Sequence, residues 1–346
     1  MPSVDSAPLA LVTGGSGFLA SSLVLLLLER GWRVRSTFRS KSRADAWLAK
    51  YPQWKEQLEP VMVEDMQWSG AYDSAIRGVE VVFHAASPFT MSFKDNERDM
   101  LVPAREGCLN MLQAAHAEPS VKRVIVTSSF AAVTSPHLDP RPGHTYTEQD
   151  WNPSTWEEAV ASKDPHFVYL ASKTFAEQAV WKFVEDNKPS FTVTTIVPPV
   201  ILGRPLQPFS SMSDINQSSR VLWRNVDCES IPATPAYNLQ VCVDVADCAL
   251  CHVLAAEAEP SVVDKKRYLT IGSSFTQTSA ARIIVKHFPE HAKRVPPIPE
   301  ELEHYSYSSA LVEKDLGIKW RSYKDTVVET FNHLAEVEAA TLAAKE

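Results

Sequence analysis

Tyr169 and Lys173 form the first pair in this sequence whose residue types and spacing could do chemistry. They lie four positions apart within 167–183, a segment with the pattern of an amphipathic helix, so both side chains would share one face. A phenol can protonate an oxygen that gains negative charge, and a nearby ammonium stabilises the phenolate and lowers the pKa of the phenol. Such pairs also occur by chance, so the prediction depends on what lies opposite them.

Ser129 is the residue that we expect opposite this pair. It ends the apolar segment "RVIVTSS", which predicts a strand, and in a parallel sheet reactive groups gather at the carboxyl ends of strands. A hydroxyl there could hydrogen-bond to a carbonyl oxygen and orient it. Ser129, Tyr169 and Lys173 are therefore the predicted catalytic residues, for reduction of a carbonyl by a nicotinamide cofactor. Glu177, one turn beyond Lys173, is expected to be a solvated helix residue.

The elements that must position these residues alternate along the chain. Short apolar segments predict strands, and the segments between them, including "GAYDSAIRG" at 70–78, predict helices. Such alternation indicates an α/β protein with a Rossmann-type, doubly wound parallel sheet covered by helices on both faces. Residues 1–200, with part of 235–260, are predicted to form the NADP-binding domain. Residues 201–346 are predicted to form a smaller, discontinuous substrate-binding lobe.

The segment "VTGGSGFLA" joins the first predicted strand to the first predicted helix. Gly15, Gly17 and Ala20 fit the dinucleotide pattern G-x-G-x-x-G/A, whereas Gly14, Gly17 and Ala20 fit the related G-x-x-G-x-x-A. Glycines let backbone N–H groups approach a pyrophosphate, and the helix N-terminus adds a favourable field. A structural glycine turn is the alternative, but the position at the first strand–helix turn favours a cofactor site.

Arg39 ends the second predicted strand, where an acidic residue would bind the ribose 2′-hydroxyl of NAD. Arg39, followed by Lys41 and Arg43, suits a 2′-phosphate instead, which favours NADP(H). The third and fourth strands end at Asp65–Met66, for the adenine, and at Ala85, Ala86 and Ser87, which are small enough to leave room for the pyrophosphate and ribose.

Composition limits the classes of partner. The formal charge of −8 and a pI near 5.7 argue against nucleic acid or an anionic membrane as the main partner. The N-terminal residues do not have the pattern of a signal peptide, and "LVLLLL" is too short to span a bilayer. The five cysteines suggest reduced thiols in the cytoplasm, and "CALC" (248–251) suggests buried structural thiols, so no metal site is expected.

With "TGGSGFLA", "VEDM", "HAASP", "VTSS" and "YLASK" in one order, the chain resembles the extended short-chain dehydrogenase/reductase superfamily. Within it, the sequence is similar to fungal carbonyl and methylglyoxal reductases and to dihydroflavonol reductase-like enzymes. The resemblance implies NADPH-dependent reduction of an aldehyde or ketone, and it places Pro198, Pro199 and Val200 near the nicotinamide. The complete expected NADP(H) site is Gly14, Gly17, Phe18, Leu19, Arg39, Arg43, Asp65, Met66, Ala85, Ala86, Ser87, Thr127, Lys173, Pro198 and Val200.

A small-molecule carbonyl substrate is expected to lie among apolar side chains that overhang the nicotinamide. The predicted substrate residues are Phe89, Phe93, Phe130, Val200, Phe209 and Met212, some of which could instead be core residues. Two rival functions share the predicted fold. One is an NADP-linked sugar-nucleotide epimerase or dehydratase, for which only Arg220 and Arg224 would suit a diphosphate in the second lobe. The other is a non-catalytic NADP-sensing regulator. The sequence does not indicate an oligomeric state.

Overall fold

A seven-stranded sheet forms the centre of the computed structural model, which describes residues 7–87, 93–134, 141–209, 211–232 and 239–343. All neighbouring strands in it run parallel, as the alternating pattern predicts. The strands, in spatial order, are β10 (Lys266–Leu269), β7 (Thr192–Val197), β5 (Arg123–Thr127), β4 (Val81–His84), β1 (Leu9–Val12), β2 (Arg33–Phe38) and β3 (Leu58–Met62). The strand order reverses between β1 and β4, the place where doubly wound sheets bind their ligands.

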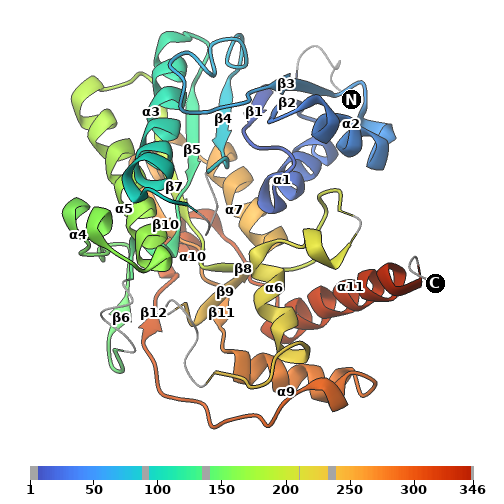
Figure 1. The fold of residues 1–346 in the computed structure, drawn as a ribbon. Helices are drawn as coiled ribbons and strands as arrows, with labels where there is room; N and C mark the ends of the chain where they lie inside the picture. Colours follow the sequence, from blue (N-terminus) through green and yellow to red (C-terminus); the bar gives the residue numbers. More distant parts are fainter. Residues whose placement is uncertain (1–6, 88–92, 135–140, 210, 233–238, 344–346) are drawn as a thin grey trace.

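Helices cover both faces of this sheet, so the predicted doubly wound fold is confirmed (Figure 1). On one face α1 (Phe18–Glu29) packs against α7 (Val245–Glu257), and α2 (Lys41–Lys50) and α10 (Ala310–Leu316) join the same core. On the other face α3 (Val102–Ala117) packs against α5 (Pro165–Asn187). The "CALC" thiols of α7, Cys248 and Cys251, are free and buried, as predicted.

A smaller group of elements follows β7. Its core lies among a three-stranded sheet and three helices: β8 (Val200–Leu202), β9 (Val241–Asp244), β11 (Ser273–Ser274), α6 (Gln217–Trp223), α9 (Gln277–His287) and α11 (Tyr323–Ala343). The chain returns to the large sheet through α7 and β10, beyond the expected 235–260. Shorter elements complete the chain: η2 (Pro52–Trp54), η3 (Glu97–Leu101), η4 (Phe130–Ala132), β6 (Thr145–Tyr146), α4 (Trp156–Ala161), η6 (Met212–Asp214), η7 (Arg224–Val226), α8 (Pro260–Val263), η9 (Ala292–Arg294) and β12 (Ser306–Tyr307).

One predicted helix is absent. Residues 70–78 form consecutive turns, because Gly70 and Gly78 at the two ends both adopt positive φ, of 78° and 70°. Tyr72, Ala75 and Ile76 between them are buried against α3 and the sheet, which gives the segment the apolar spacing that resembled a helix. The prediction of a helix there was therefore wrong.

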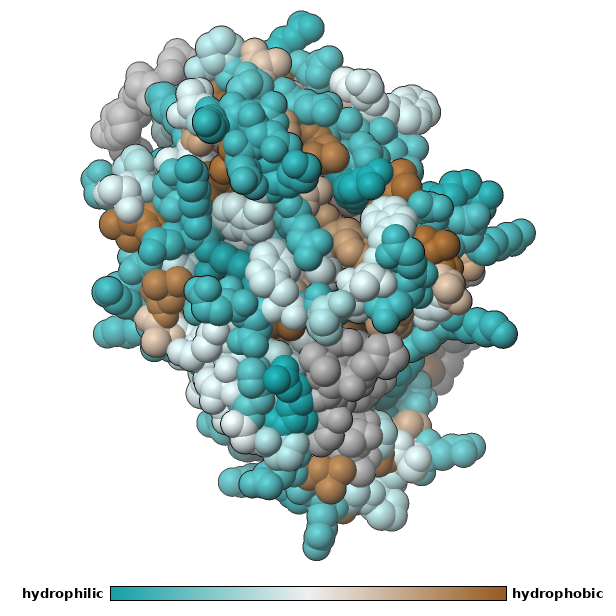
Figure 2. Space-filling model, turned by 90° about the vertical axis from the view of Figure 1, so that its left-hand side faces the viewer, coloured by the Kyte–Doolittle hydropathy of each residue, from teal (hydrophilic) through white to brown (hydrophobic). Residues whose placement is uncertain are grey.

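The outer surface is mainly polar where it can be seen. Figure 2 shows the face that carries α4 and α5, on which hydrophilic residues predominate and hydrophobic ones occur in small, separate groups. Among the described residues, none of the helices combines the length and the apolarity that crossing a bilayer demands.

Candidate active site

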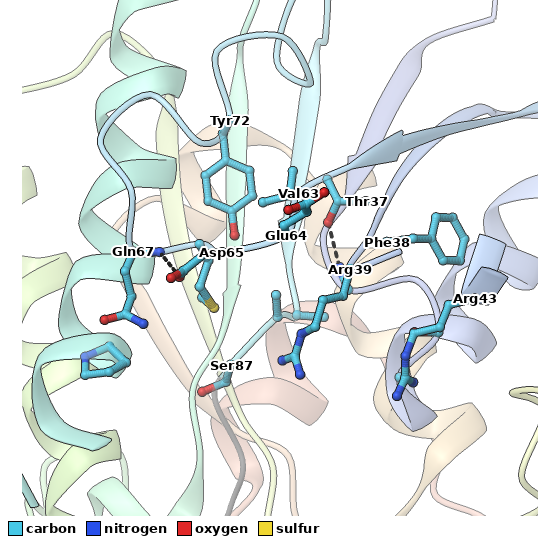
Figure 3. Close-up of a pocket in the computed structure, with 17 residues that line it drawn as sticks. Thr37, Phe38, Arg39, Arg43, Val63, Glu64, Asp65, Gln67, Tyr72 and Ser87 are labelled. Atoms are coloured by element: carbon cyan, nitrogen blue, oxygen red, sulfur yellow. Dashed lines mark hydrogen bonds between the residues drawn. The ribbon is translucent and has the colours of Figure 1, made fainter. Parts of the chain in front are cut away.

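A cavity of about 500 Å³ opens at the carboxyl ends of β1, β2 and β4, at the point where the strand order reverses (Figure 3). Its walls combine the glycine turn, the ends of β2 and β4, the segment after β3 and one residue of α3. The lining residues are Gly14, Ser16, Gly17, Thr37, Phe38, Arg39, Arg43, Val63, Glu64, Asp65, Met66, Gln67, Tyr72, Ala85, Ala86, Ser87 and Pro103. Nine of the predicted cofactor residues are among them.

The glycine turn packs closely on its neighbours, which a Cβ at these positions would hinder. Gly14 has a φ of +76°, and a Cβ on it would lie only 3.2 Å from Ala86, which lines the cavity beside it. Its N–H donates a hydrogen bond of 3.0 Å to Thr37 Oγ1 (Figure 3). Gly15 instead allows close packing of the turn on β2, because a Cβ there would lie 2.2 Å from Ser36 Oγ. Gly14 and Gly17 line the cavity and Gly15 does not, so the G-x-x-G-x-x-A pattern describes this turn better.

The N-terminus of α1 begins directly at this turn. Gly17 is its N-cap residue and supplies no side-chain acceptor to the first-turn N–H groups. Amide groups at such a helix start, together with the helix dipole, are a suitable site for a phosphate. Phe18 and Leu19 follow at the start of the helix. The Leu19 side chain is buried in the core, so this residue can offer only its backbone N–H to a ligand.

Arg39 and Arg43 supply positive charge to the same cavity. Figure 3 shows their guanidinium groups extending in the same direction, Arg39 from the end of β2 and Arg43 from α2. Neither forms an ion pair with any residue that the structure describes, whereas Lys41 between them is paired with Asp45 at 2.7 Å. Arg39 and Arg43 are therefore the two cations of this segment that remain able to bind an anion.

Asp65 and Met66 lie on the opposite side of the cavity and are held by local contacts. Asp65 Oδ1 accepts a hydrogen bond of 2.9 Å from the Gln67 N–H, and the Met66 carbonyl accepts one of 3.0 Å from Asn110. The Met66 side chain lies against Gly107 of α3, where a Cβ would come within 2.2 Å of its methyl group. Met66 thus brings an apolar side chain to the cavity, which suits one face of an adenine ring.

Tyr169 and Lys173 project from the first half of α5. The helix begins sharply there, because the Asp164 side chain accepts a hydrogen bond from the His166 N–H and Pro165 occupies the first turn. Lys173 Nζ lies 5.2 Å from the centre of the Tyr169 ring and donates a hydrogen bond to Ser87 Oγ at the cavity. Ser87 thus connects the pair to the cavity.

Burial shifts the pKa values of Tyr169 and Lys173 in opposite directions. It raises the pKa of Tyr169 to about 12, because the phenolate is poorly solvated. It lowers the pKa of Lys173 to about 8, because the ammonium is poorly solvated, and this effect exceeds the opposing effect of Cys108. The lysine therefore exchanges its proton near neutral pH far more readily than an exposed lysine does.

Ser129 lies beside this helix. Its backbone is extended (φ −158°, ψ 149°), it caps η4, and its Oγ accepts a hydrogen bond of 3.1 Å from the Ala131 N–H. Because a hydroxyl both accepts and donates, its proton can still be donated to a carbonyl oxygen. Helix α5 packs directly against η4, so the fold brings Ser129 and the Tyr169–Lys173 pair onto adjacent elements.

The expectation for Glu177 was wrong. Its side chain is buried rather than solvated, and it forms an ion pair of 2.8 Å with Arg267 of β10. It also accepts hydrogen bonds from Ser128 Oγ at 2.6 Å and from Thr195 Oγ1 at 2.9 Å. The face of α5 that carries Lys173 therefore continues into a buried polar network.

Three other predicted cofactor residues lie outside the cavity as described. Thr127 Oγ1 is within hydrogen-bond distance, 2.8 Å, of His252 Nε2 in α7. The Pro198 carbonyl accepts a hydrogen bond of 2.8 Å from the Phe130 N–H, and Val200 begins β8 and packs on the second-lobe core. That Thr127, Pro198 and Val200 contact a nicotinamide remains a prediction.

The predicted substrate residues do not form one group. Phe130 is fully buried against Tyr146 and Tyr305, with ring centres 5.4 and 5.8 Å away, so the expectation that it borders a substrate is corrected: it is a core residue. Phe209 and Met212 are partly buried on the core of the smaller group of elements, and Phe93 packs against a core cluster that includes Met100, Leu101 and Phe167. Phe89 lies outside the described residues.

Several cavity residues escaped the sequence analysis. Thr37 directly precedes Phe38 and Arg39, so its position at the end of β2 could have identified it. Tyr72 escaped because 70–78 was interpreted as a helix. Glu64 was passed over beside Asp65, although both follow the same strand.

Known proteins show which family shares this arrangement. The sequence model described as the 3-beta hydroxysteroid dehydrogenase/isomerase family matches residues 11–270. Aldehyde reductase 2 of Sporidiobolus salmonicolor is 34% identical, over 94% of this chain and 97% of that protein. A ketoreductase of Aspergillus niger is 32% identical over the same shares. The crystal structure of yeast methylglyoxal/isovaleraldehyde reductase in complex with NADPH superimposes with a TM-score of 0.88 at 27% identity, covering 96% of this chain and 99% of that one.

Proposed function

The chain belongs to the 3-beta hydroxysteroid dehydrogenase/isomerase family, and from this premise we propose that it is an NADPH-dependent reductase of aldehydes and ketones. Relatives that match nearly the whole chain bear the names aldehyde reductase and ketoreductase, and the yeast reductase was crystallised with NADPH. The observation that carries the proposal is Lys173, which hydrogen-bonds Ser87 of the cavity while lying against Tyr169 on the same helix face.

The cavity fits NADPH in its shape and charge. Gly14 and Gly17, with the start of α1, would hold the pyrophosphate, because both line the cavity and present no side chain to a ligand. Arg39 and Arg43 would bind the 2′-phosphate, and Asp65 and Met66 would border the adenine. When bound, the cofactor supplies the hydride that reduces the carbonyl carbon.

The residues of the chain supply the proton and the orientation. Ser129 donates a hydrogen bond to the carbonyl oxygen, and Tyr169 donates the proton that this oxygen needs as it becomes an alcohol. Lys173, a cation at neutral pH, would stabilise the phenolate that forms at Tyr169.

The two rival functions receive less support. Arg220, which a sugar-nucleotide enzyme could use for a diphosphate, donates hydrogen bonds to the carbonyls of Ser213 and Ile215 instead. A regulator without catalysis would have no need of the pair of Tyr169 and Lys173. We also propose that the enzyme works in the cytoplasm, since the five cysteines are free thiols, and that its partner is a small carbonyl compound.

The proposal is tested by adding NADPH and a panel of aliphatic and aromatic aldehydes and ketones to the purified protein. Loss of NADPH absorbance and formation of the matching alcohol are expected with at least one compound, with a smaller rate when NADH replaces NADPH. Full retention of NADPH with every carbonyl compound would refute the proposed activity.

A further inference from the structure

A buried ion pair lies directly behind the proposed active site. Glu177 follows Lys173 by one turn of α5, and Arg267 belongs to β10, two strands away from β5 in the sheet (Figure 1). Both side chains are almost completely inaccessible to solvent, with 0% exposure for Glu177 and 8% for Arg267. Charged groups at such depth are normally paired and fully hydrogen-bonded, because an unpaired buried charge is costly.

Arg267 uses all five of its N–H donors. Nε and one terminal nitrogen bind the Glu177 carboxylate at 2.8 and 3.1 Å. The remaining donors reach the backbone carbonyls of Glu148 and Asp150, at 3.1 and 2.6 Å, and of Ala132, at 3.4 Å. The guanidinium also lies 3.8 Å from the centre of the Trp151 ring. Arg267 therefore holds the backbone in place at the end of η4 and at residues 148–150.

Glu177 connects the same pair to the residue before Ser129. Its Oε2 accepts a hydrogen bond of 2.6 Å from Ser128 Oγ, while the Ser128 N–H donates to the Ile196 carbonyl of β7 at 2.7 Å. In extended backbone, successive side chains point to opposite sides, and Ser129 is extended. Holding the Ser128 hydroxyl on one side therefore sets the direction of the Ser129 hydroxyl on the other.

We propose that the Glu177 carboxylate is a positioning residue that orients Ser129 toward the carbonyl substrate by acting through Ser128. This role rests on the proposed reductase function. Helix α5 presents Tyr169, Lys173 and Glu177 at four-residue intervals. The helix that carries the proton donor therefore also orients the Ser129 hydroxyl, which donates a hydrogen bond to the carbonyl oxygen. The Tyr169 phenol and the Ser129 hydroxyl are thereby held in a fixed position relative to each other.

The test uses two variants, Ser128→Ala and Glu177→Gln. Ser128→Ala removes the hydrogen bond from the Ser128 hydroxyl to the Glu177 carboxylate and leaves the Glu177–Arg267 ion pair intact. Turnover at saturating NADPH and carbonyl substrate should fall about tenfold in Ser128→Ala, because small misplacements of an orienting group are costly in rate, while the KM for NADPH stays within about twofold. Thr195→Val is the matched control. It removes another hydrogen bond to the same carboxylate, at 2.9 Å, and should leave the turnover number within about twofold of wild type.

A double-mutant cycle separates positioning from general loosening. In a Ser129→Ala background, Ser128→Ala should lower the residual rate no further, because the hydroxyl that it positions is gone. An equal loss in both backgrounds, or full activity of Ser128→Ala, would overturn the positioning role. A wild-type protein that oxidises no NADPH with any carbonyl compound would refute the proposed function itself. If the wild type is active but the losses of rate in Ser128→Ala and Ser129→Ala add in the double variant, only the role of Glu177 is refuted.

Discussion

Arg39→Ala is the substitution that tests the cofactor site most directly. Arg39 lines the cavity from the end of β2, and among the described residues it has no carboxylate partner, so its charge is available to a ligand. Removing it takes away a charge-assisted contact to the 2′-phosphate, which NADPH has and NADH lacks. The binding of NADPH should therefore weaken, whereas the binding of NADH should change little.

The size of this effect follows from the exposure of the side chain. Hydrogen bonds to charged groups contribute about 1.5–3 kcal/mol, or roughly 10- to 150-fold in the dissociation constant. Arg39 is exposed, so solvent screens its charge, and the Arg43 guanidinium remains on the same cavity. The expected loss of NADPH affinity is therefore near the lower limit, at about 10- to 30-fold.

Fluorescence titration of both variant and wild type with NADPH and NADH measures the four dissociation constants. Lys41→Ala is the matched control, since Lys41 is a neighbouring cation that is paired with Asp45 and does not line the cavity. It should bind NADPH as the wild type does. The NADPH affinity of Arg39→Ala should also lose part of its salt dependence. Equal weakening of NADPH and NADH by Arg39→Ala would refute the 2′-phosphate assignment.

Three further predictions concern the remainder of the site. Tyr169→Phe should lower turnover by about 10²–10⁴-fold with NADPH affinity within about twofold, and near-normal turnover in a steady-state assay would exclude Tyr169 as the proton donor. The turnover number should fall as pH rises through about 8, because Lys173 is a cation below its pKa and neutral above it; a flat profile across that range would contradict its electrostatic role. Gly14→Ala should lower the free energy of unfolding in urea by about 1 kcal/mol, because a Cβ is disfavoured at φ +76°, and it should also weaken NADPH by crowding Ala86; unchanged stability and affinity would contradict this account.

Local patterns predicted most of the fold and the positions of many residues that line the cavity. Alternating apolar strands and helices, a glycine turn after the first strand, and an arginine after the second are all short-range signals, and each lies where it was expected. The exception, the 70–78 segment, shows why such signals fail. Its apolar spacing suited a helix, but the conformations of Gly70 and Gly78 bend the chain into turns.

Features that depend on distant partners could not be predicted. Glu177 was assigned to solvent because its partner Arg267 is 90 residues further along the chain. Phe130 was assigned to the substrate because only the fold reveals that Tyr146 and Tyr305 enclose it. In both cases the residue type was noticed, but the burial that decides its role is set by segments with no local sequence relation to it.

The position of Arg267 has a consequence for how the protein is made. A nascent chain exposes Glu177 well before β10 emerges from the ribosome, so the carboxylate must wait for its guanidinium before it can be buried at low cost. We therefore expect the edge of the sheet at β7 to stay open until residues 266–269 have been synthesised.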